Sequence, residues 1–485
     1  MLAAVAACGG DSGAGPTLPP ARIDFVDGAV EPVLVRGQAV VVEGYGFGST
    51  QGSGTLTFGR SGGGTVAGPI ADSTDWSEFA VRTTVPDSAG SGFLSLTTAD
   101  GLVVTKLVHV MPRVAFDPAV LTWQARAGFP KAPVGVALAV AEFPPASGFA
   151  PTLYAAGGAE PLGGDSVFVP DSGVYLARAT IGGGGAITAW ARQRDAAVTA
   201  DNRVLGSPRA FAAAAVATRH NSRYGQTGRG ILYVIGGIDA TGRALSTVLA
   251  ADVTADSVAS PFVPLEPLPA PVAGAIAVVR RGRLYVIGGA DSVGLPQPHV
   301  YVARVSTTGQ IDGWYVQPAI PGPRAYGGGI VRDERAVAFG GVMDSVPPGA
   351  GLDATPARLA TADSAAVSLV SGFFTSAWAS AGSLLPDPRS QFAALDVGSH
   401  VLIVGGMYAG APADASETIA ATATGDSLGA FAGPVGANTI AGLGGGTLVG
   451  PTGATWRDGT GVVHGLVLGG MDLQTRLRRT GVWGF

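Results

Sequence analysis

The chain has very little cysteine and little charge. Cys8 is the single cysteine among 485 residues, which excludes disulfides within the chain and any thiolate metal cluster built from this chain alone. Charged residues make up 13% of the chain and the net charge is -5 at pH 7, so no basic surface for nucleic acid or anionic lipid is expected. Beyond the N-terminus, no apolar run reaches the roughly 18 residues that a membrane-spanning helix requires.

Glycine, proline and apolar residues are abundant instead. The chain contains 76 glycines and 34 prolines, and 47% of its residues are hydrophobic. This combination predicts a packed, turn-rich β protein rather than a disordered chain. The length allows two or three domains, and we expect two folded ones.

The lone cysteine follows Val5-Ala6-Ala7. Val-Ala-Ala-Cys resembles the lipobox of bacterial lipoproteins, in which the cysteine is lipidated after the signal peptide is removed. The resemblance implies lipidation of Cys8, a bacterial outer-membrane or cell-surface location, and a flexible tether up to residue 20. The preceding apolar run is short and lacks a basic flank, so we interpret it as a signal peptide whose start codon was placed too late. A disordered N-terminus with an incidental cysteine, in a secreted protein, is the alternative.

Residues 21–111 alternate apolar and polar residues in short runs that glycine and proline separate. Such runs predict a β-sandwich. In Gly44-Tyr45-Gly46-Phe47-Gly48, the glycines allow a sharp bend with φ > 0, and Phe47 is expected to turn inward as a plug. Trp76 is expected in the sandwich core, with a surface ligand platform as the alternative. The predicted strands are residues 40–43, 55–58, 79–85, 93–97 and 103–110.

The order of these landmarks resembles the IPT/TIG family of immunoglobulin-like domains. The resemblance covers nearly the whole segment from residue 21 to residue 111 and is carried mainly by the Gly-x-Gly-Phe-Gly run. It implies a spacer or recognition module rather than an enzyme. A phosphate-cradling loop would need a helix after the glycines, and no helical pattern follows them.

A strand that ends in a glycine pair recurs six times in residues 112–485. Each copy is a short apolar run followed by Gly-Gly, as in Leu232-Tyr233-Val234-Ile235-Gly236-Gly237. A continuous apolar run predicts a strand buried on both faces, and the glycines allow positive φ and close backbone approach. The pairs begin at Gly157, Gly236, Gly288, Gly340, Gly405 and Gly469.

Two further landmarks accompany the glycine pairs. A proline followed by arginine or valine precedes each pair, and an aromatic residue precedes each proline. We attribute the uneven spacing to inserted loops such as residues 219–230 and 450–460, so that each unit has four strands. The prolines are Pro133, Pro208, Pro271, Pro323, Pro388 and Pro434, and the aromatic residues are Trp123, Trp190, Phe262, Trp314, Trp378 and Phe431.

Four-stranded units that repeat about every 50 residues and carry a glycine pair resemble kelch repeats. The resemblance implies an all-β fold: a small Ig-like β-sandwich at residues 21–111, then a six-bladed kelch-like β-propeller at residues 112–485. After Gly470 the chain provides only one more strand, and Trp123 has no unit of its own. We therefore predict a strand at residues 119–125 beside the C-terminal strand, so that N- and C-terminal strands close the ring.

No residue pattern marks an enzyme or a metal site. The five histidines never fall at metal-ligand spacing, and no serine-hydrolase, zinc-protease or Ca²⁺-loop motif is present. Copper radical oxidases also combine a kelch propeller with an immunoglobulin-like domain, but their cofactor needs a cysteine in the propeller, and Cys8 lies in the tether. We therefore expect no cofactor, no metal and no copper radical activity.

Two sets of charged residues are candidate ligand-binding residues. Aspartates that follow glycine pairs would share one face of a propeller and bind a cation or a sugar there, with solvated turn aspartates as the alternative. Arginines that follow the prolines suit carboxylates or sulfated glycans. The alternative is that they bond carbonyls of neighbouring blades and so pin the ring. The candidates are Asp239, Asp291, Asp344 and Asp472, and Arg209, Arg324 and Arg389.

The predicted function is that of a non-catalytic cell-envelope lipoprotein whose propeller binds a protein or glycan at one face. The alternative is a carbohydrate-active enzyme, mutarotase-like or glycan-processing, with its site at the mouth of the channel; similar propellers include a sialic acid mutarotase. Propellers host both kinds of function. Membrane contact is expected only through the lipid anchor, and no nucleic-acid partner is expected.

Overall fold

The computed structural model describes residues 20–142, 151–161, 168–180, 184–193, 203–332, 334–345, 356–408, 417–424, 427–440, 448–472 and 479–485. Over these ranges the protein is all-β, with two short 3-10 helices, η1 (Ser73–Asp75) and η2 (Pro118–Val120). Cys8 and most of the expected tether lie outside the described residues. None of the helices in the described ranges has the length and apolar character to cross a membrane.

The N-terminal part contains a three-stranded and a five-stranded sheet around one core. All five strands predicted there are present. Phe47 and Trp76 are buried in the core as expected, and the Trp76 Nε1 donates to the Phe47 carbonyl at 3.1 Å. The sheets are β1 (Arg22–Val26), β3 (Ala39–Tyr45) and β6 (Ala80–Thr84), and β2 (Val33–Val35), β8 (Val103–Met111), β7 (Gly92–Thr97), β4 (Thr55–Gly59) and β5 (Thr65–Ala67).

Six further sheets follow, each built on four antiparallel strands, and we number them along the chain. Sheet 1 is β10 (Ala137–Ala141), β11 (Thr152–Ala156), β14 (Val174–Arg178) and β15 (Ala191–Arg192). Sheet 2 is β16 (Ala213–Thr218), β17 (Arg229–Ile235), β18 (Val248–Thr254) and β19 (Ser257–Val258), with β20 (Val263–Pro264) also on β18. Sheet 3 is β21 (Ile276–Arg280), β22 (Arg283–Ile287), β23 (Val300–Arg304) and β24 (Tyr315–Val316).

Sheets 4 to 6 repeat the pattern. Sheet 4 is β25 (Gly328–Arg332), β26 (Arg335–Phe339), β27 (Thr361–Ala366) and β28 (Ala379–Ser383). Sheet 5 is β30 (Ala393–Asp396), β31 (His400–Val404), β33 (Thr418–Thr424) and β34 (Ser427–Leu428), and sheet 6 is β35 (Thr452–Arg457), β36 (Val463–Leu468), β37 (Val482–Gly484) and β9 (Gln124–Ala125). Two-stranded ribbons, β12 (Ala159–Pro161) with β13 (Phe168–Pro170) and β29 (Arg389–Ser390) with β32 (Met407–Tyr408), lie outside these sheets.

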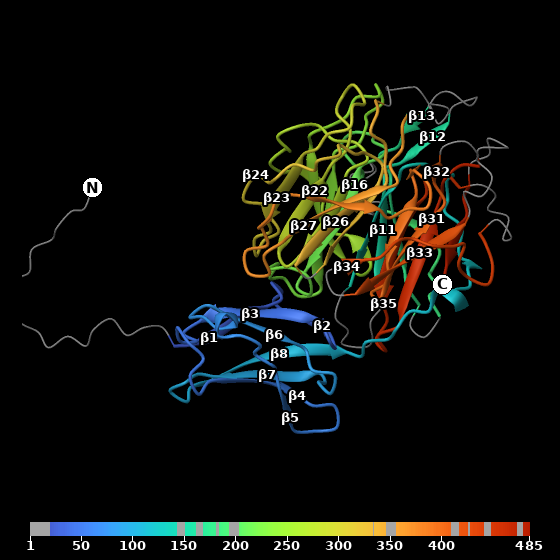
Figure 1. The fold of residues 1–485 in the computed structure, drawn as a ribbon. Coiled ribbons are helices and arrows are strands. Elements are labelled where there is room, and N and C mark those ends of the chain that lie inside the picture. Colours follow the sequence, from blue (N-terminus) through green and yellow to red (C-terminus); the bar gives the residue numbers. More distant parts are fainter. Residues whose placement is uncertain are drawn as a thin grey trace, which may run out of the picture.

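The second strand of each sheet is the one that ends in the glycine pair. It is buried along nearly its whole length because it packs against the sheets on either side, which is why it is continuously apolar. The first strands contact one another in a closed cycle, β10 to β16, β21, β25, β30, β35 and back to β10. Figure 1 shows the sheets gathered into one body, with the blue N-terminal sheets as a lobe at one end.

The predicted pairing of an N-terminal with the C-terminal strand is present, but the N-terminal strand is shorter than the expected residues 119–125. It covers only Gln124–Ala125, because Pro118–Val120 form η2, which Asp117 caps. In β9 and β37, Ala125 is opposite Trp483 and Gln124 is opposite Gly484. Trp123 is buried in the core cluster that contains Trp483, and its Nε1 donates to the Thr418 Oγ1 at 2.9 Å. It therefore packs on sheets 5 and 6 rather than on the N-terminal sheets.

The glycine pairs join neighbouring sheets. The second glycine of each pair donates its N–H to a backbone carbonyl that lies four residues before the first strand of the next sheet, at 2.8–3.1 Å. The bond from Gly470 to the Pro133 carbonyl closes the cycle. A Cβ at Gly288, which has φ +65, would lie 2.5 Å from the Arg324 carbonyl oxygen. The pair is therefore needed both for its backbone conformation and for this close approach.

This contact corrects the sixth proline landmark. In sheet 6 the carbonyl that accepts from Gly406 belongs to Leu448, not to Val435, whose N–H instead donates to the Thr418 carbonyl. Residues 452–457, expected inside an inserted loop, form β35, the first strand of sheet 6. The reason is that the contact uses a backbone carbonyl, which any residue supplies, so no proline-arginine pair is required there.

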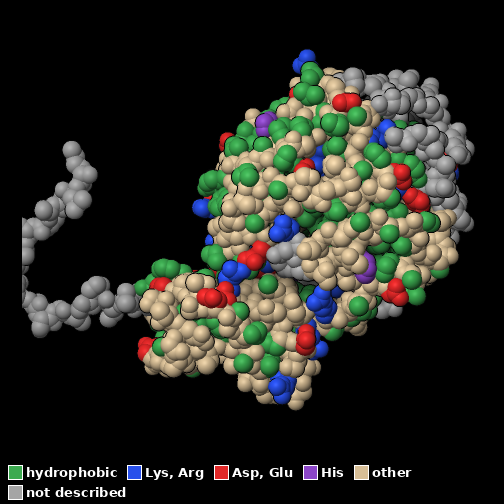
Figure 2. All heavy atoms as spheres, viewed as in Figure 1, with side chains coloured by type: hydrophobic (Ala, Val, Ile, Leu, Met, Phe, Trp, Pro, Cys, Tyr) green, Lys and Arg blue, Asp and Glu red, His purple; other side chains and the backbone are tan. Residues whose placement is uncertain are grey.

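The N-terminal lobe meets the sheets through ion pairs. Figure 2 shows acidic and basic side chains along the seam between the two parts. Asp27 is 8% exposed and Arg281 is 6% exposed, so this pair is nearly removed from water. The pairs are Glu31 with Arg219 at 2.8 Å, Glu43 with Arg223 at 2.6 Å, Asp27 with Arg280 at 3.3 Å and with Arg281, and Arg82 with Glu334.

Candidate functional site

The three arginines predicted as ligand contacts are buried inside the sheet structure. Arg209, Arg324 and Arg389 are 1%, 1% and 0% exposed. Each donates Nη1 to the carbonyl of the first glycine of the pair in its own sheet, at 3.1, 3.0 and 3.4 Å. Arg324 also pairs with Asp363, and Arg389 pairs with Glu417 at 2.5 Å. These bonds hold each arginine within its own sheet, so they are neither ligand contacts nor the expected bonds to carbonyls of neighbouring units.

Neutral side-chain partners distinguish Arg209 from the other two arginines, which pair with carboxylates. Its Nη1 also donates to the Thr247 Oγ1 at 3.1 Å, and its Nη2 donates to the Ser207 Oγ at 2.8 Å. Both partners are neutral, and burial lowers the pKa of Arg209 to about 10. The guanidinium still carries its charge at neutral pH.

The four aspartates each bind their own loop. Asp239 accepts from the Thr241 and Arg243 amides at 2.8 and 3.1 Å, and Asp291 accepts from the Val293 and Leu295 amides at 3.0 and 2.9 Å. Asp344 accepts from the Ala357 amide at 3.1 Å, and Asp472 pairs with Arg479 at 2.7 Å. Within the described residues, no group of three or more His, Cys, Asp or Glu side chains is arranged to hold a metal ion.

The first strands surround a channel, and a ring of backbone hydrogen bonds lies at one end of it. Six residues form this ring, each of them two positions before a first strand. Each donates its N–H to the carbonyl of the ring residue of the preceding sheet, at 2.7–3.3 Å, and the bond between the first and last sheets closes the ring. All six have φ between 53° and 65°. The ring residues are Gly135, Phe211, Gly274, Tyr326, Gln391 and Gly450.

A cavity of about 500 Å³ occupies the opposite end of the channel. Aliphatic side chains of the first strands form its wall, among them Leu138, Val216 and Ile330. The N-terminal lobe covers it with side chains of β2, β8 and the turn between β2 and β3. The lobe contributes Val33, Val35, Gln38 and Met111.

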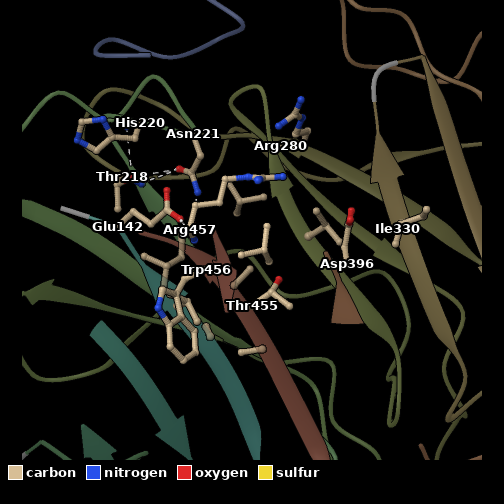
Figure 3. Close-up of a pocket in the computed structure, with 18 of the residues that line it drawn as sticks. Glu142, Thr218, His220, Asn221, Arg280, Ile330, Asp396, Thr455, Trp456 and Arg457 are labelled. Carbon is tan, nitrogen blue, oxygen red and sulfur yellow. Dashed lines mark hydrogen bonds between the residues drawn. The ribbon is translucent and has the colours of Figure 1, made fainter. Parts of the chain in front are cut away.

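Polar side chains stand where the first strands end. Every first strand runs away from the backbone ring, so the residues at its carboxyl end gather at the junction with the N-terminal lobe. Figure 3 shows Glu142 and Arg457 close together in the cavity, with Asp396 on another strand. The six strand-end residues, one from each sheet, are Glu142, Thr218, Arg280, Arg332, Asp396 and Arg457.

Most of these charges have partners. Arg332 binds both carboxylate oxygens of Asp396, with its Nε at 2.8 Å from Oδ2. Arg280 pairs with Asp27 of the N-terminal lobe at 3.3 Å. The Arg457 guanidinium donates from Nη1 to the Gly461 carbonyl at 3.1 Å.

Burial shifts the pKa values of two neighbouring groups of the cluster, Glu142 and Arg457. Burial raises the pKa of Glu142, although the backbone N–H and the charge of Arg457 oppose the shift. Burial lowers the pKa of Arg457, and the Asp396 and Glu142 carboxylates oppose that shift. The Arg457 guanidinium nevertheless stays charged at neutral pH. A bound anion would therefore compensate for part of the hydration that this guanidinium loses on burial.

A second hollow of about 350 Å³ adjoins the cavity on the side of the junction. It shares Arg280, Asp396 and Arg457 with the cavity. Arg36, Arg113 and Arg332 also line it. Five arginines and one carboxylate, Asp396, therefore line this hollow, which gives it a positive potential.

No pattern in the sequence predicted this cluster. The six strand-end residues have different types, so no repeated residue marks them. Three of them share a position, because Arg280, Arg332 and Asp396 precede the glycine pair of their sheet by nearly the same number of residues. A search for polar residues at that offset would have found these three but not Glu142, Thr218 or Arg457.

Comparison with known proteins assigns no family. No family model matches the sequence, and no curated protein matches it. The solved structure of YjhT resembles the chain with a TM-score of 0.47 and 13% identity, over 74% of this chain and 96% of that one. A likeness at this level carries no argument about the function of this chain.

Proposed function

We propose that residues 112–485 form a six-bladed kelch-like propeller and residues 21–111 an IPT/TIG-like immunoglobulin domain. The closed cycle of first strands, the six glycine-pair contacts and the pairing of β9 with β37 support the propeller. Two sheets around one core support the immunoglobulin-like domain. The lipobox-like Val5-Ala6-Ala7-Cys8 supports attachment to a bacterial cell envelope.

The function that follows from the cavity is non-catalytic binding of a small carboxylate with an apolar body. The observation that carries this proposal is the position of Arg457 and Arg280 at one end of a cavity of about 500 Å³ whose wall is partly aliphatic and partly polar. A guanidinium binds a carboxylate through two parallel hydrogen bonds, and the aliphatic wall favours a hydrocarbon body. The cover formed by the N-terminal lobe excludes a macromolecule from this cavity.

Calorimetric titration with octanoate and with 1-octanol tests this proposal, because the two probes differ mainly in charge. Octanoate is expected to bind and octanol to bind much more weakly. Arg457→Met should weaken octanoate binding about tenfold or more, since it removes a charged hydrogen-bond donor but keeps an apolar stem. Arg229→Met, at an exposed site on β17, is the matched control. Equal binding of the two probes, or octanoate binding that ignores Arg457→Met, would sink the proposal.

The raised pKa of Glu142 favours a second candidate, a carbohydrate-active enzyme that acts on an acidic sugar in the same cavity. A carboxyl group with a raised pKa is suited to proton transfer near neutral pH. Magnetisation-exchange NMR of the two anomers of glucuronate measures mutarotation directly. Acceleration that Glu142→Gln abolishes, with glucuronate affinity unchanged, would support the enzyme; a rate equal to that in buffer would remove it.

A further inference from the structure

The backbone ring contains three residues in a conformation that favours glycine. Phe211, Tyr326 and Gln391 have φ of 53°, 56° and 54°. Glycine occupies the other three ring positions and adopts the same conformation without strain. Large side chains at positive φ are uncommon and cluster where a site requires them.

Packing accounts for part of this choice. Phe211 packs beside Val134 and Met471, and Tyr326 packs beside Ala325 and Val342. The two aromatic rings also contact each other edge to face, with centroids 5.4 Å apart. Gln391 is polar, so apolar packing of this kind does not account for its presence in the ring.

The Gln391 side chain carries an unsatisfied polar atom. Its Oε1 is buried and accepts no hydrogen bond in the described part of the chain. A buried amide oxygen without a donor is costly, and such atoms in native structures require an explanation. Gln391 lines the recess described next, and a turn of its side-chain amide toward that recess would let a ligand hydroxyl donate to this oxygen.

Gln391 lines a recess of about 150 Å³ together with the other ring residues. Phe211 and Tyr326 are both partly exposed, so aromatic surface is accessible there. No charged residue is among those that line the recess, and burial raises the pKa of Tyr326 to about 12, so its hydroxyl remains a neutral donor. The recess is much smaller than a pocket for a drug-sized ligand.

We infer that this recess is a binding subsite for one neutral sugar ring, at the end of the channel opposite the carboxylate cavity. A pyranose has an apolar face that stacks on an aromatic ring and hydroxyls that bond a phenol and an amide. The absence of charge in the lining disfavours a uronic or sialic acid, whose carboxylate would be desolvated without a cation. This subsite and the carboxylate cavity are formed by different residues, so either one can exist without the other.

Saturation-transfer NMR tests the inference with the methyl glycosides of glucose, galactose and mannose and with methyl glucuronide. At least one neutral glycoside is expected to bind the chain from residue 20 onward, and the glucuronide more weakly. Gln391→Gly should reduce the affinity about tenfold or more, because it removes the amide. Since glycine adopts the ring conformation freely, the unfolding midpoint should not fall, which separates loss of a ligand contact from loss of the fold.

Two matched variants keep the outcome distinct from that of the carboxylate proposal. Arg457→Met should leave glycoside binding unchanged, and Gln391→Gly should leave octanoate binding unchanged. The inference is overturned if no neutral glycoside binds, if Gln391→Gly binds as well as the unmodified chain, or if the glucuronide binds more tightly than its neutral counterpart.

Discussion

The two ends of the channel are constructed in different ways. At the ring end, backbone hydrogen bonds connect six residues with positive φ, and the recess there has no charged lining. At the junction end, side chains from six different sheets and from the N-terminal lobe surround a cavity with several arginines. The closed ring of hydrogen bonds fixes the backbone conformation of its six residues. At the strand ends, by contrast, the repeated fold does not require any particular type of side chain. Charge is therefore concentrated where the repeat imposes the fewest constraints.

The largest predicted effect concerns the junction. Asp27→Asn keeps the size of the side chain and tolerates the positive φ of 53° at this position, but it removes the negative charge that Asp27 places against the buried Arg281. We expect a loss of about 3 to 5 kcal/mol in the free energy of unfolding, measured by urea denaturation. Arg22→Gln, at an exposed surface pair with Asp24, is the control and should change the stability by less than about 1 kcal/mol. Similar losses in the two variants would mean that the junction contributes no more than the surface.

The next effect concerns the backbone contacts between sheets. Gly288→Ala places a Cβ against the Arg324 carbonyl and strains a residue with φ +65, so we expect a loss of about 2 to 4 kcal/mol. Gly313→Ala, with φ +101 and open space around the site, isolates the strain and should cost about 1 to 2 kcal/mol. If both variants lose the same amount, the close approach of neighbouring sheets does not matter for stability.

The smallest effect concerns the pH dependence of the junction end. Because burial raises the folded-state pKa of Glu142 above its ordinary 4.5, the folded state holds this proton more tightly than the unfolded state. Stability therefore falls as pH rises from about 4.5 through the folded-state pKa. Glu142→Gln should stabilise the protein at neutral pH, and the gain should vanish below about pH 4. Denaturation across this range, with exposed Glu266→Gln as the control, measures it; a gain that persists at low pH would show that charge is not its cause.

The sequence predicted the strands well where a physical constraint recurs. Glycine pairs after apolar runs located the second strand of every sheet, because burial on both faces and close approach leave few alternatives there. Trp123 and the shortage of chain after Gly470 located the pairing of β9 with β37. The same reasoning failed at Pro434, because the contact it should have marked is made by the carbonyl of Leu448.

The candidate site was much less predictable. Arg209, Arg324 and Arg389 attracted attention as a repeated residue type, yet all three are buried and bond the carbonyls of glycine pairs. The cavity at the junction depends on side chains of different types from six sheets and on a cover from the N-terminal lobe. Such a site exists only after the chain has folded, and no local pattern records it. Repetition in this chain therefore marks structure, while the residues that break the repeat form the candidate sites.

A crystal structure of the chain from residue 20 onward with 8-bromooctanoate tests the central claim most directly. The anomalous signal of bromine places the hydrocarbon end of the ligand, and the electron density places the carboxylate. We predict bromine within the aliphatic wall near Leu138 and Ile330, and the carboxylate on the Arg457 guanidinium. An empty cavity at saturating ligand, or a carboxylate bound elsewhere with Arg457 still on the Gly461 carbonyl, would contradict the account.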